Sequence, residues 1–266
     1  QGLHDLGALH PRGFMEWGKE AAIRTPSILV RLYRACARYL FGSPHVVIAP
    51  SQFVLDEFER AKFFPKSKKV VIGNPVMHDL SHSPSPGLRP PSPAGRGKGE
   101  GERFLYIGQL EPYKGLRVLL AAWKEFIVSH PNATLEIVGK GSLEEEVRRA
   151  SQSLAGIVYR GFVTHDDLYP ILKGARATIM PSLAYETFGM SAAESLSYGV
   201  PVIASRIGAL PEIVRDGVDG ILVTPGDVQA LQNALEQLSK EPFASMASYF
   251  FSPAQYREIL EELVAV

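Results

Sequence analysis

Two glutamates at a fixed spacing are the residues of this chain best suited to chemistry. Glu186 and Glu194 lie with seven residues between them. A short apolar run at 177–180, typical of a strand, precedes them, and a run typical of a helix at 190–198 contains the second. We therefore expect Glu186 in the loop between a strand and a helix, and Glu194 in the second turn of that helix.

The expected start of this helix, near residues 188–190, suits a phosphate. The first N–H groups of a helix have no intrahelical acceptor, and the helix dipole places positive charge at the same end. A carboxylate on either side of a bound phosphate can accept hydrogen bonds from sugar hydroxyls. A nucleotide-sugar has this order of groups: hydroxyls, diphosphate, hydroxyls.

Strand-like and helix-like segments alternate from residue 102 onward. We expect strands near 103–108, 134–138, 157–160, 177–180, 201–204 and 220–223. We expect helices near 115–129, 142–152, 165–174, 189–198, 209–214 and 227–239. Alternation of this kind predicts an α/β fold with a doubly wound parallel sheet covered on both faces. Ligands of such sheets bind beyond the carboxyl ends of the strands.

The segment before residue 81 follows the same alternation over a shorter length. The pattern predicts a helix at 27–40, with Ile28, Leu32, Ala35 and Tyr39 on one face. It also predicts a strand at 46–49, a helix at 52–62 capped by Ser51, and a strand at 70–72.

These patterns divide the chain into four parts. Residues 1–80 form a partial N-terminal domain, and residues 102–242 form a Rossmann-like domain. Residues 81–101 are rich in Pro, Gly and Ser, so we expect a disordered linker or insertion. Residues 243–266 form a helical tail.

Composition argues against several classes of protein. The formal charge is zero, which argues against a nucleic-acid binder. The single cysteine, Cys36, rules out an internal disulfide framework and a Cys-based zinc site. No apolar run approaches the ~20 residues of a membrane span, and the chain does not open on a signal peptide. No HExxH or Asp-x-Asp metal motif occurs. We expect a cytoplasmic, metal-independent protein.

Taken together, these motifs resemble the family 4 glycosyltransferases, also called glycosyl transferases group 1. Glu186 and Glu194 match the family's E-x7-E motif, and the resemblance extends over roughly residues 103–240. Further stretches agree in order and spacing, at 106–110, 114–115, 135–141, 161–163, 208–214 and 219–223. The resemblance implies the GT-B fold, in which two Rossmann-like domains face a cleft, and transfer of a sugar with retention of configuration.

The resemblance also implies roles for individual residues. Glu186 would contact hydroxyls of the transferred sugar, Glu194 the ribose, and Lys114 the diphosphate, whose growing charge Lys114 would stabilise. Backbone N–H groups would bind the diphosphate at Thr187, Phe188, Gly189 and Met190. Further donor contacts would come from Gly108, Gln109, Gly139, Lys140, Phe162 and Val163.

Three features depart from the family pattern or match it only briefly. Gln109 stands where the family commonly has arginine, so one cation for the diphosphate is lost. His4 with Asp5 resembles a His-Asp pair near the reacting sugar, which makes His4 a catalytic candidate, while a structural role for it stays equally open. The first half of the acceptor domain, with its glycine-rich loop, has no counterpart. We therefore expect a truncated or reduced form whose tail helix packs back on the N-terminal domain.

The sequence thus predicts a retaining transferase that moves a hexose from a UDP- or GDP-sugar to a glycan or lipid-linked acceptor. It predicts no other cofactor and a role in cell-envelope polysaccharide synthesis. Many members of the family sit loosely on the membrane, and the helix at 27–40 carries Arg31, Arg34 and Arg38, which could meet anionic lipid. A solvated helix face is the alternative.

Other functions stay open. The lost half-domain and Gln109 leave open a nucleotide-sugar-binding fragment or pseudoenzyme without transfer. A nicotinamide-dependent oxidoreductase is a weaker alternative, because Val138-Gly139-Lys140-Gly141 begins like G-x-G-x-x-G but Glu144 takes the place of the third glycine. An epimerase or a glycan phosphorylase would share the architecture, and the sequence identifies no pyridoxal lysine for the latter.

Overall fold

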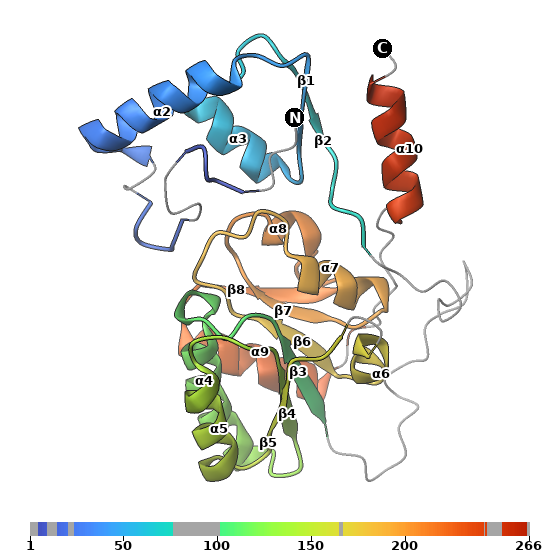
Figure 1. Ribbon diagram of the computed structural model, residues 1–266. Coiled ribbons are helices and arrows are strands. Elements are labelled where there is room, and N and C mark those ends of the chain that lie inside the picture. The colour runs from blue at the N-terminus through green and yellow to red at the C-terminus, as the bar shows by residue number, and fades with distance from the viewer. Residues whose placement is uncertain are drawn as a thin grey trace.

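The computed structural model describes residues 5–9, 15–20, 24–76, 102–164, 167–241, 243 and 252–264. The proposed linker at 81–101 and His4 lie outside these residues. We call described residues 5–76 the N-terminal lobe and residues 102–241 the sheet domain. Figure 1 shows the lobe stacked on the sheet domain, with α10 (Pro253–Val264) at the same end of the molecule as the lobe.

The sheet domain is built on six parallel strands. They are β3 (Arg103–Ile107), β4 (Thr134–Val138), β5 (Ile157–Gly161), β6 (Ala177–Met180), β7 (Val202–Ser205) and β8 (Gly220–Val223). Their order is β5-β4-β3-β6-β7-β8, and each neighbouring pair is parallel. The winding reverses between β3 and β6, so the predicted doubly wound α/β fold is confirmed. A sheet of this order binds ligands at the carboxyl ends of the two strands where it reverses.

Helices connect these strands close to the predicted places. They are η2 (Pro112–Lys114), α4 (Leu116–Ser129), α5 (Glu144–Ser153), α6 (Leu168–Leu172), α7 (Met190–Ser197), α8 (Leu210–Ile213) and α9 (Val228–Lys240). The helix expected at 165–174 is shorter, because α6 spans five residues. Within the part of the chain that the structure describes, no helix is long and apolar enough to cross a bilayer.

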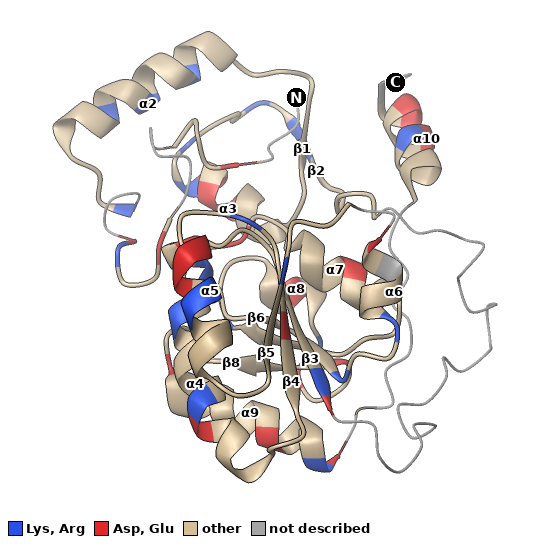
Figure 2. Ribbon diagram, turned by 60° about the horizontal axis from the view of Figure 1, so that its bottom comes forward, with Lys and Arg blue, Asp and Glu red and all other residues tan. Residues whose placement is uncertain are grey.

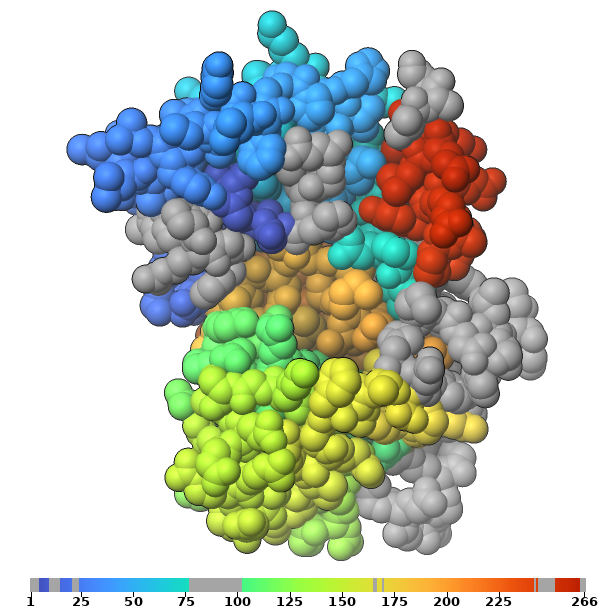
Figure 3. Space-filling view, in the orientation of Figure 1, coloured from blue at the N-terminus to red at the C-terminus, as the bar shows by residue number. Residues whose placement is uncertain are grey.

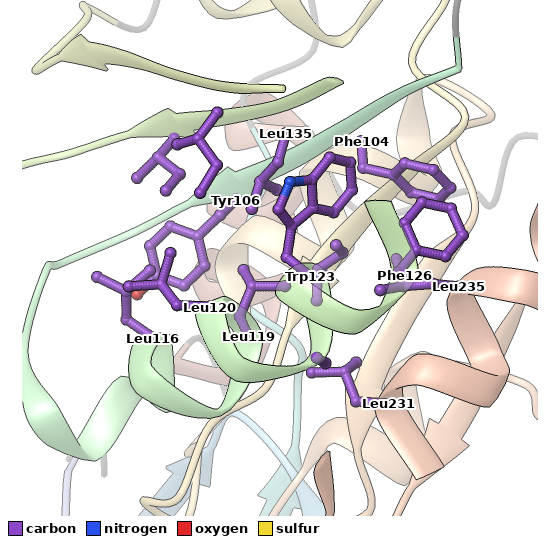
Figure 4. Close-up of a cluster of buried hydrophobic side chains, with 14 of the residues drawn as sticks. Phe104, Tyr106, Leu116, Leu119, Leu120, Trp123, Phe126, Leu135, Leu231 and Leu235 are labelled. Carbon is purple, nitrogen blue, oxygen red and sulfur yellow. The ribbon is translucent and has the colours of Figure 1, made fainter. Parts of the chain in front are cut away.

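Alternation along β3 divides its side chains between the two faces of the sheet. Phe104 and Tyr106 pack against the α4 and α9 side, while Leu105 packs against α6 on the other side. Figure 4 shows the first of these clusters, in which Trp123 of α4 is fully buried. The indole Nε1 of Trp123 donates to the carbonyl of Ala155 at 3.0 Å, so the ring is fixed at its polar edge as well.

The N-terminal lobe consists of α2 (Ile28–Phe41), β1 (Val46–Ala49), α3 (Gln52–Arg60) and β2 (Lys68–Val71). β1 and β2 form a parallel pair, and the hydroxyl of Ser51 caps α3 by accepting from the N–H of Val54 at 3.3 Å. The apolar face predicted for α2 is uncovered: Ile28 and Tyr39 are 75% and 88% exposed. The buried residues of α2 are Arg34 and Ala37.

The two parts of the molecule meet through specific hydrogen bonds. The Ser51 hydroxyl donates to the carbonyl of Thr187 at 2.7 Å. The Glu212 carboxylate, on α8, accepts from the backbone N–H groups of Gln52 and Phe53 at 2.8 Å each. A side chain of the sheet domain therefore satisfies the first N–H groups of α3 in the N-terminal lobe. The lobe is thus attached beside Glu186.

Candidate active site

Two loops meet where the order of the sheet reverses. One leads from β3 through η2 to α4, and the other, residues 181–189, leads from β6 to α7; we call it the Glu186 loop. Gly115 has φ +74°, and a Cβ there would lie 1.8 Å from the carbonyl oxygen of Pro181, so only glycine allows this approach. The N–H groups of Leu183 and Ala184 donate to the Tyr113 carbonyl at 2.8 and 3.0 Å.

This approach brings together two residues 72 positions apart. Lys114 Nζ lies 2.7 Å from Glu186 Oε1, and their side chains are 22% and 13% exposed. The fully covered hydroxyl of Ser182 donates to the same oxygen at 2.7 Å. Among the described residues, both of these contacts use Oε1 rather than Oε2. Sequence reasoning missed Ser182, although a hydroxyl four residues before Glu186 in the same loop could have indicated it.

The main chain of Glu186 is held from its other side by the β7–α8 connection. The N–H of Ala209 donates to the Glu186 carbonyl at 2.9 Å. Gly208 has φ +58°, and a Cβ there would lie 2.4 Å from the same carbonyl oxygen. Both the side chain and the backbone of Glu186 are therefore fixed, which is the preorganisation that a catalytic carboxylate requires.

The helix after Glu186 begins at the predicted place. Gly189 precedes α7 with φ +100°, and the N–H groups of Ala192 and Ala193 both donate to its carbonyl at 3.0 Å. The N–H groups of Met190 and Ser191 come before these intrahelical bonds, at the positive end of the helix dipole. This end of α7 therefore has the donors and the field that a phosphate requires.

The neighbours of this helix start have structural side chains. Phe188 is 4% exposed and packs with Val76 and Ala193. The Thr187 carbonyl takes the hydrogen bond from Ser51 described above. The Phe188 ring therefore belongs to the packing between α7 and the N-terminal lobe. Glu194 lies in the second turn of α7, as predicted, and is half-buried.

A second group of residues lies directly after β3. Gln109 is exposed, and its side-chain carbonyl accepts from the Tyr113 hydroxyl at 2.9 Å. The Tyr106 hydroxyl donates to the Gln109 main-chain carbonyl at 2.7 Å. Burial first, and then the charge of Glu186, raises the pKa of Tyr106, so its hydroxyl remains a donor. The N–H of Gly108 donates to the Val138 carbonyl, which continues the hydrogen bonding between β3 and β4.

The ends of β4 and β5 carry the remaining predicted residues. Lys140 Nζ lies 4.9 Å from the centre of the Phe162 ring, which is 65% exposed. A Cβ at Gly139, where φ is +144°, would meet the Gly108 carbonyl at 1.8 Å. Val163 is half-buried and packs toward the cluster of Leu105, so its side chain supports the loop from behind.

The start of α5 differs from that of α7, because a protein carboxylate already covers it. Glu111 accepts from the N–H of Ser142 at 2.9 Å and from its hydroxyl at 2.6 Å. These hydrogen bonds lower the pKa of Glu111. α7 is therefore the better place for a ligand's diphosphate. Among the described residues, no group of three or more His, Cys, Asp or Glu side chains could hold a metal ion.

The predicted site residues thus fall into one arrangement, apart from His4, which lies outside the described residues. Lys114, Gln109 and Glu186 gather where the sheet order reverses, with Glu194 on the adjoining helix. Lys140 and Phe162 lie further along the same edge, after β4 and β5. In Figure 3 the orange surface around α7 and α8 is set back between the blue N-terminal lobe and the green and yellow-green surface around η2, α4 and α5.

Such a fold and site define a class of α/β proteins that bind nucleotide ligands at the reversal point of a parallel sheet. Residues 101–241, a little over half of the chain, match the family model described as "Glycosyl transferases group 1". The chain therefore belongs to this family. The resemblance stated from the motifs is confirmed.

Curated relatives agree with this assignment. The chain is 34% identical to a glycogen synthase of Mycobacterium tuberculosis over 53% of its own length and 35% of that protein's. It is 28% identical to the O-antigen chain mannosyltransferase C of Escherichia coli over 79% of its own length and 55% of that protein's. The chain thus spans only about a third to a little over half of these two relatives.

Solved structures share the fold. The structure of Anabaena HepE in complex with UDP and glucose has a TM-score of 0.73 and 24% identity, covering 100% of this chain and 71% of that one. The sucrose-phosphate synthase of Thermosynechococcus elongatus has a TM-score of 0.71 and 22% identity, covering 99% and 67%. These likenesses confirm the predicted fold class.

Proposed function

We propose that this chain carries the donor site of a retaining glycosyltransferase that moves a hexose from a nucleoside-diphosphate sugar to a glycan or lipid-linked acceptor. The observation that carries the proposal is the Lys114–Glu186 pair at the reversal point of the sheet, beside the start of α7. A cation and a helix start together suit a diphosphate. Within the described part of the chain both contacts of this fixed carboxylate use Oε1, so Oε2 suits the hydroxyls of the sugar next to it.

In this arrangement the donor lies along the edge of the sheet. The diphosphate meets Lys114 and the N–H groups at the start of α7, and the hexose meets Glu186. Glu194 takes the ribose hydroxyls, and the base extends toward Phe162. HepE has been crystallised with UDP-glucose, which supports a nucleotide-sugar of this kind.

Transfer then requires little covalent chemistry from the protein. The bond from the sugar's anomeric carbon to the diphosphate breaks, and a bond to the acceptor oxygen forms on the same face. The acceptor's proton passes to the departing diphosphate oxygen, so no protein base is consumed. Lys114 stabilises the negative charge that grows on the leaving group, while Glu186 stabilises the positive character of the sugar.

The alternative is a protein that binds the nucleotide-sugar without transferring it. Gln109 favours this alternative, because its amide is engaged with Tyr113 and brings no charge to the diphosphate. The two functions separate in one measurement. Both predict binding of a nucleoside diphosphate, but only the transferase releases that diphosphate from the intact donor when an acceptor is added.

Calorimetric titration of the purified chain with UDP, GDP and ADP tests the donor site. We expect one nucleotide to bind, and Glu194→Ala to weaken it about 10- to 100-fold, because a charged acceptor for the ribose hydroxyls is lost. Glu125→Ala, an exposed glutamate of α4, is the matched control and should bind as the parent does. Equal affinity in parent and Glu194→Ala would contradict the assignment of Glu194.

We further propose that α2 contacts an anionic membrane surface, where a lipid-linked acceptor would be found. Ile28, Leu29, Leu40 and Tyr39 are each at least 75% exposed on α2, which contains no acidic residue. Exposed Lys62, Lys66 and Lys68 follow α3 in the same lobe. Figure 2 shows basic positions along α2 and around β1 and β2. Apolar side chains beside cations fit an anionic interface.

Two of the three arginines that suggested this contact from the sequence are engaged within the lobe; half-buried Arg38 donates to the Ala61 carbonyl at 3.1 Å. Arg34 is buried, and its Nε donates to the Leu9 carbonyl at 2.7 Å. Arg31 remains exposed on α2. The membrane contact therefore depends mainly on the apolar side chains of α2 and on the lysines that follow α3.

Sedimentation with phosphatidylglycerol vesicles at low salt tests this contact. We expect the chain to sediment with these vesicles, to stay in solution with phosphatidylcholine, and to lose binding about tenfold in Leu29→Glu. Val128→Glu, an equally exposed apolar position on α4, is the control and should bind as the parent does. Self-association without vesicle binding would instead assign the face to a second copy of the chain.

A further inference from the structure

An exposed indole ring of the N-terminal lobe lies beside the Glu186 loop. Trp17 is 47% exposed, whereas Trp123 of the sheet domain is fully buried. Large exposed aromatic rings next to a reaction site are efficient binding surfaces, because they offer much rigid contact area at low conformational cost. None of the roles assigned to the donor site uses Trp17.

Backbone hydrogen bonds fix the position of this residue. The N–H of Trp17 donates to the Leu183 carbonyl at 2.7 Å, and the N–H of Tyr185 donates to the Met15 carbonyl at 2.7 Å. Glu16 and Ala184 form an antiparallel bridge between the same two segments. The segment around Trp17 therefore runs beside the Glu186 loop as a short strand pair. Because these bonds belong to the main chain, the indole itself is not needed to keep the segment in place.

The Trp17 ring is the exposed end of a stack of three aromatic rings. Its centroid lies 6.4 Å from that of Tyr185 at an interplanar angle of 28°, and Tyr185 lies 5.5 Å from Phe53 at 21°. Phe53 is partly buried and packs against the core of the N-terminal lobe. The stack thus extends from that core to the indole.

The middle ring of the stack is also fixed at its polar end. The Tyr185 hydroxyl donates to Glu20 at 2.8 Å, and burial with this hydrogen bond raises the pKa of Tyr185 to about 12. The hydroxyl therefore stays protonated and holds the ring in one orientation. Tyr185 belongs to the Glu186 loop, so the stack joins the indole to that loop.

A pyranose ring has the shape and polarity for such a surface. Its faces present C–H groups, which gain free energy when an aromatic face shields them from water, while its hydroxyls stay at the edge. The Glu16–Lys19 ion pair, at 2.7 Å, lies in the same segment and offers polar groups to those hydroxyls.

We propose that Trp17 is the binding surface for the acceptor sugar, which is a pyranose stacked on the indole beside the donor hexose. The proposal rests on the proposed function and specifies its acceptor: the sugar that receives the hexose binds from the side of the N-terminal lobe. The nucleobase of the donor is a poorer occupant of the Trp17 ring. In the proposed function the base extends toward Phe162, and the loops after β4 and β5 belong to the other half of the sheet.

Intrinsic fluorescence tests the proposal directly, because the chain has two tryptophans of opposite exposure. Trp123 is buried and bonded to Ala155, so acrylamide should quench only Trp17. With saturating UDP present, methyl α-glucoside, methyl α-mannoside and maltose are titrated separately. We expect at least one of them to shift the emission to shorter wavelength and to reduce quenching by acrylamide. In Trp17→Phe both effects should disappear while UDP binding is kept.

Two results would overturn the proposal without touching the proposed function. Shielding of Trp17 by UDP alone would make the indole a nucleobase surface. If calorimetry shows UDP binding but none of the sugars changes the fluorescence of Trp17, the donor site stands and Trp17 is not the acceptor site. If the parent chain does not bind UDP, GDP or ADP, by contrast, the result counts against the proposed function itself.

A transfer assay separates binding from structure once an acceptor glycoside gives turnover. Trp17→Ala should raise the acceptor KM about three- to tenfold, as loss of one aromatic contact does, with kcat and the donor KM unchanged. Trp17→Phe should restore most of the affinity. A fall in kcat and in thermal stability together, without a change in the acceptor KM, would show a merely structural role and contradict the proposal.

Discussion

Replacing Glu186 with glutamine is expected to lower kcat for sugar transfer about 100-fold while leaving UDP binding as tight as in the parent or up to fivefold tighter. The first effect follows from the transition state, in which the sugar carries positive character that a fixed carboxylate stabilises and a neutral amide does not. Ser182 and Lys114 hold this carboxylate by one oxygen, at 2.7 Å each.

The second effect follows from the pairing of Glu186 with Lys114. A bound diphosphate must compete with the Glu186 carboxylate for the ammonium group of Lys114, because the two side chains already form an ion pair. A partly exposed pair of this kind contributes up to about 1 kcal/mol, which corresponds to about fivefold in affinity. Glutamine removes the competing charge but keeps the shape of the side chain.

Two assays on the same preparations check this prediction. Calorimetry measures UDP affinity, and release of UDP from UDP-glucose with a glycan acceptor measures transfer; GDP and GDP-mannose replace them if GDP is the nucleotide that binds. Glu125→Gln, an exposed position of α4, is the control. UDP affinity falling in parallel with kcat would show that Glu186 serves binding of the nucleotide rather than the sugar, which contradicts its assigned role.

Lys114→Ala is expected to lower kcat about 100- to 1000-fold, the range found when a single preorganised charge stabiliser is removed. Gln109 is neutral, so the loop after β3 has no second cation at that position to compensate. UDP affinity should fall as well, by about tenfold, because a charge-assisted hydrogen bond to the diphosphate is lost. The effect on transfer exceeds that on binding because the charge on the leaving group grows in the transition state.

An exposed lysine outside the site provides the comparison. Lys124→Ala on the outer side of α4 should leave both quantities unchanged. Lys114→Arg keeps the charge and should retain more activity than Lys114→Ala. Equal losses in the arginine and alanine variants would mean that the packing of Lys114 matters rather than its charge.

The sheet domain could be predicted from the sequence almost residue by residue, because strand and helix periodicities there are local and consistent. The β6–Glu186–α7 segment illustrates this, since the apolar run at 177–180, the glycine at 189 and the spacing to Glu194 each indicate the observed structure. The pairing of Lys114 with Glu186 could not be derived in this way. It depends on the close approach of Gly115 to Pro181, between segments far apart in the chain.

The N-terminal lobe shows the limit of pattern reasoning more clearly. The helix at α2 was predicted, but its pattern could not tell that Ile28 and Tyr39 would stay exposed while Arg34 would be buried against Leu9. Burial depends on which neighbours are present, and periodicity does not contain that information. The aromatic stack of Trp17, Tyr185 and Phe53 was missed for the same reason, because it joins three segments of distant sequence.

The cap that Glu212 provides for α3 bears on how the polypeptide acquires its structure during synthesis. α3 has nine residues, too few for a stable isolated helix, and its capping carboxylate is made about 160 residues later. The N-terminal lobe leaves the ribosome first, yet it cannot complete this contact until α8 has been translated. The sheet domain does not depend on this contact for its own strand pairing. The first N–H groups of α3 therefore gain their carboxylate partner only late in the synthesis of the described chain.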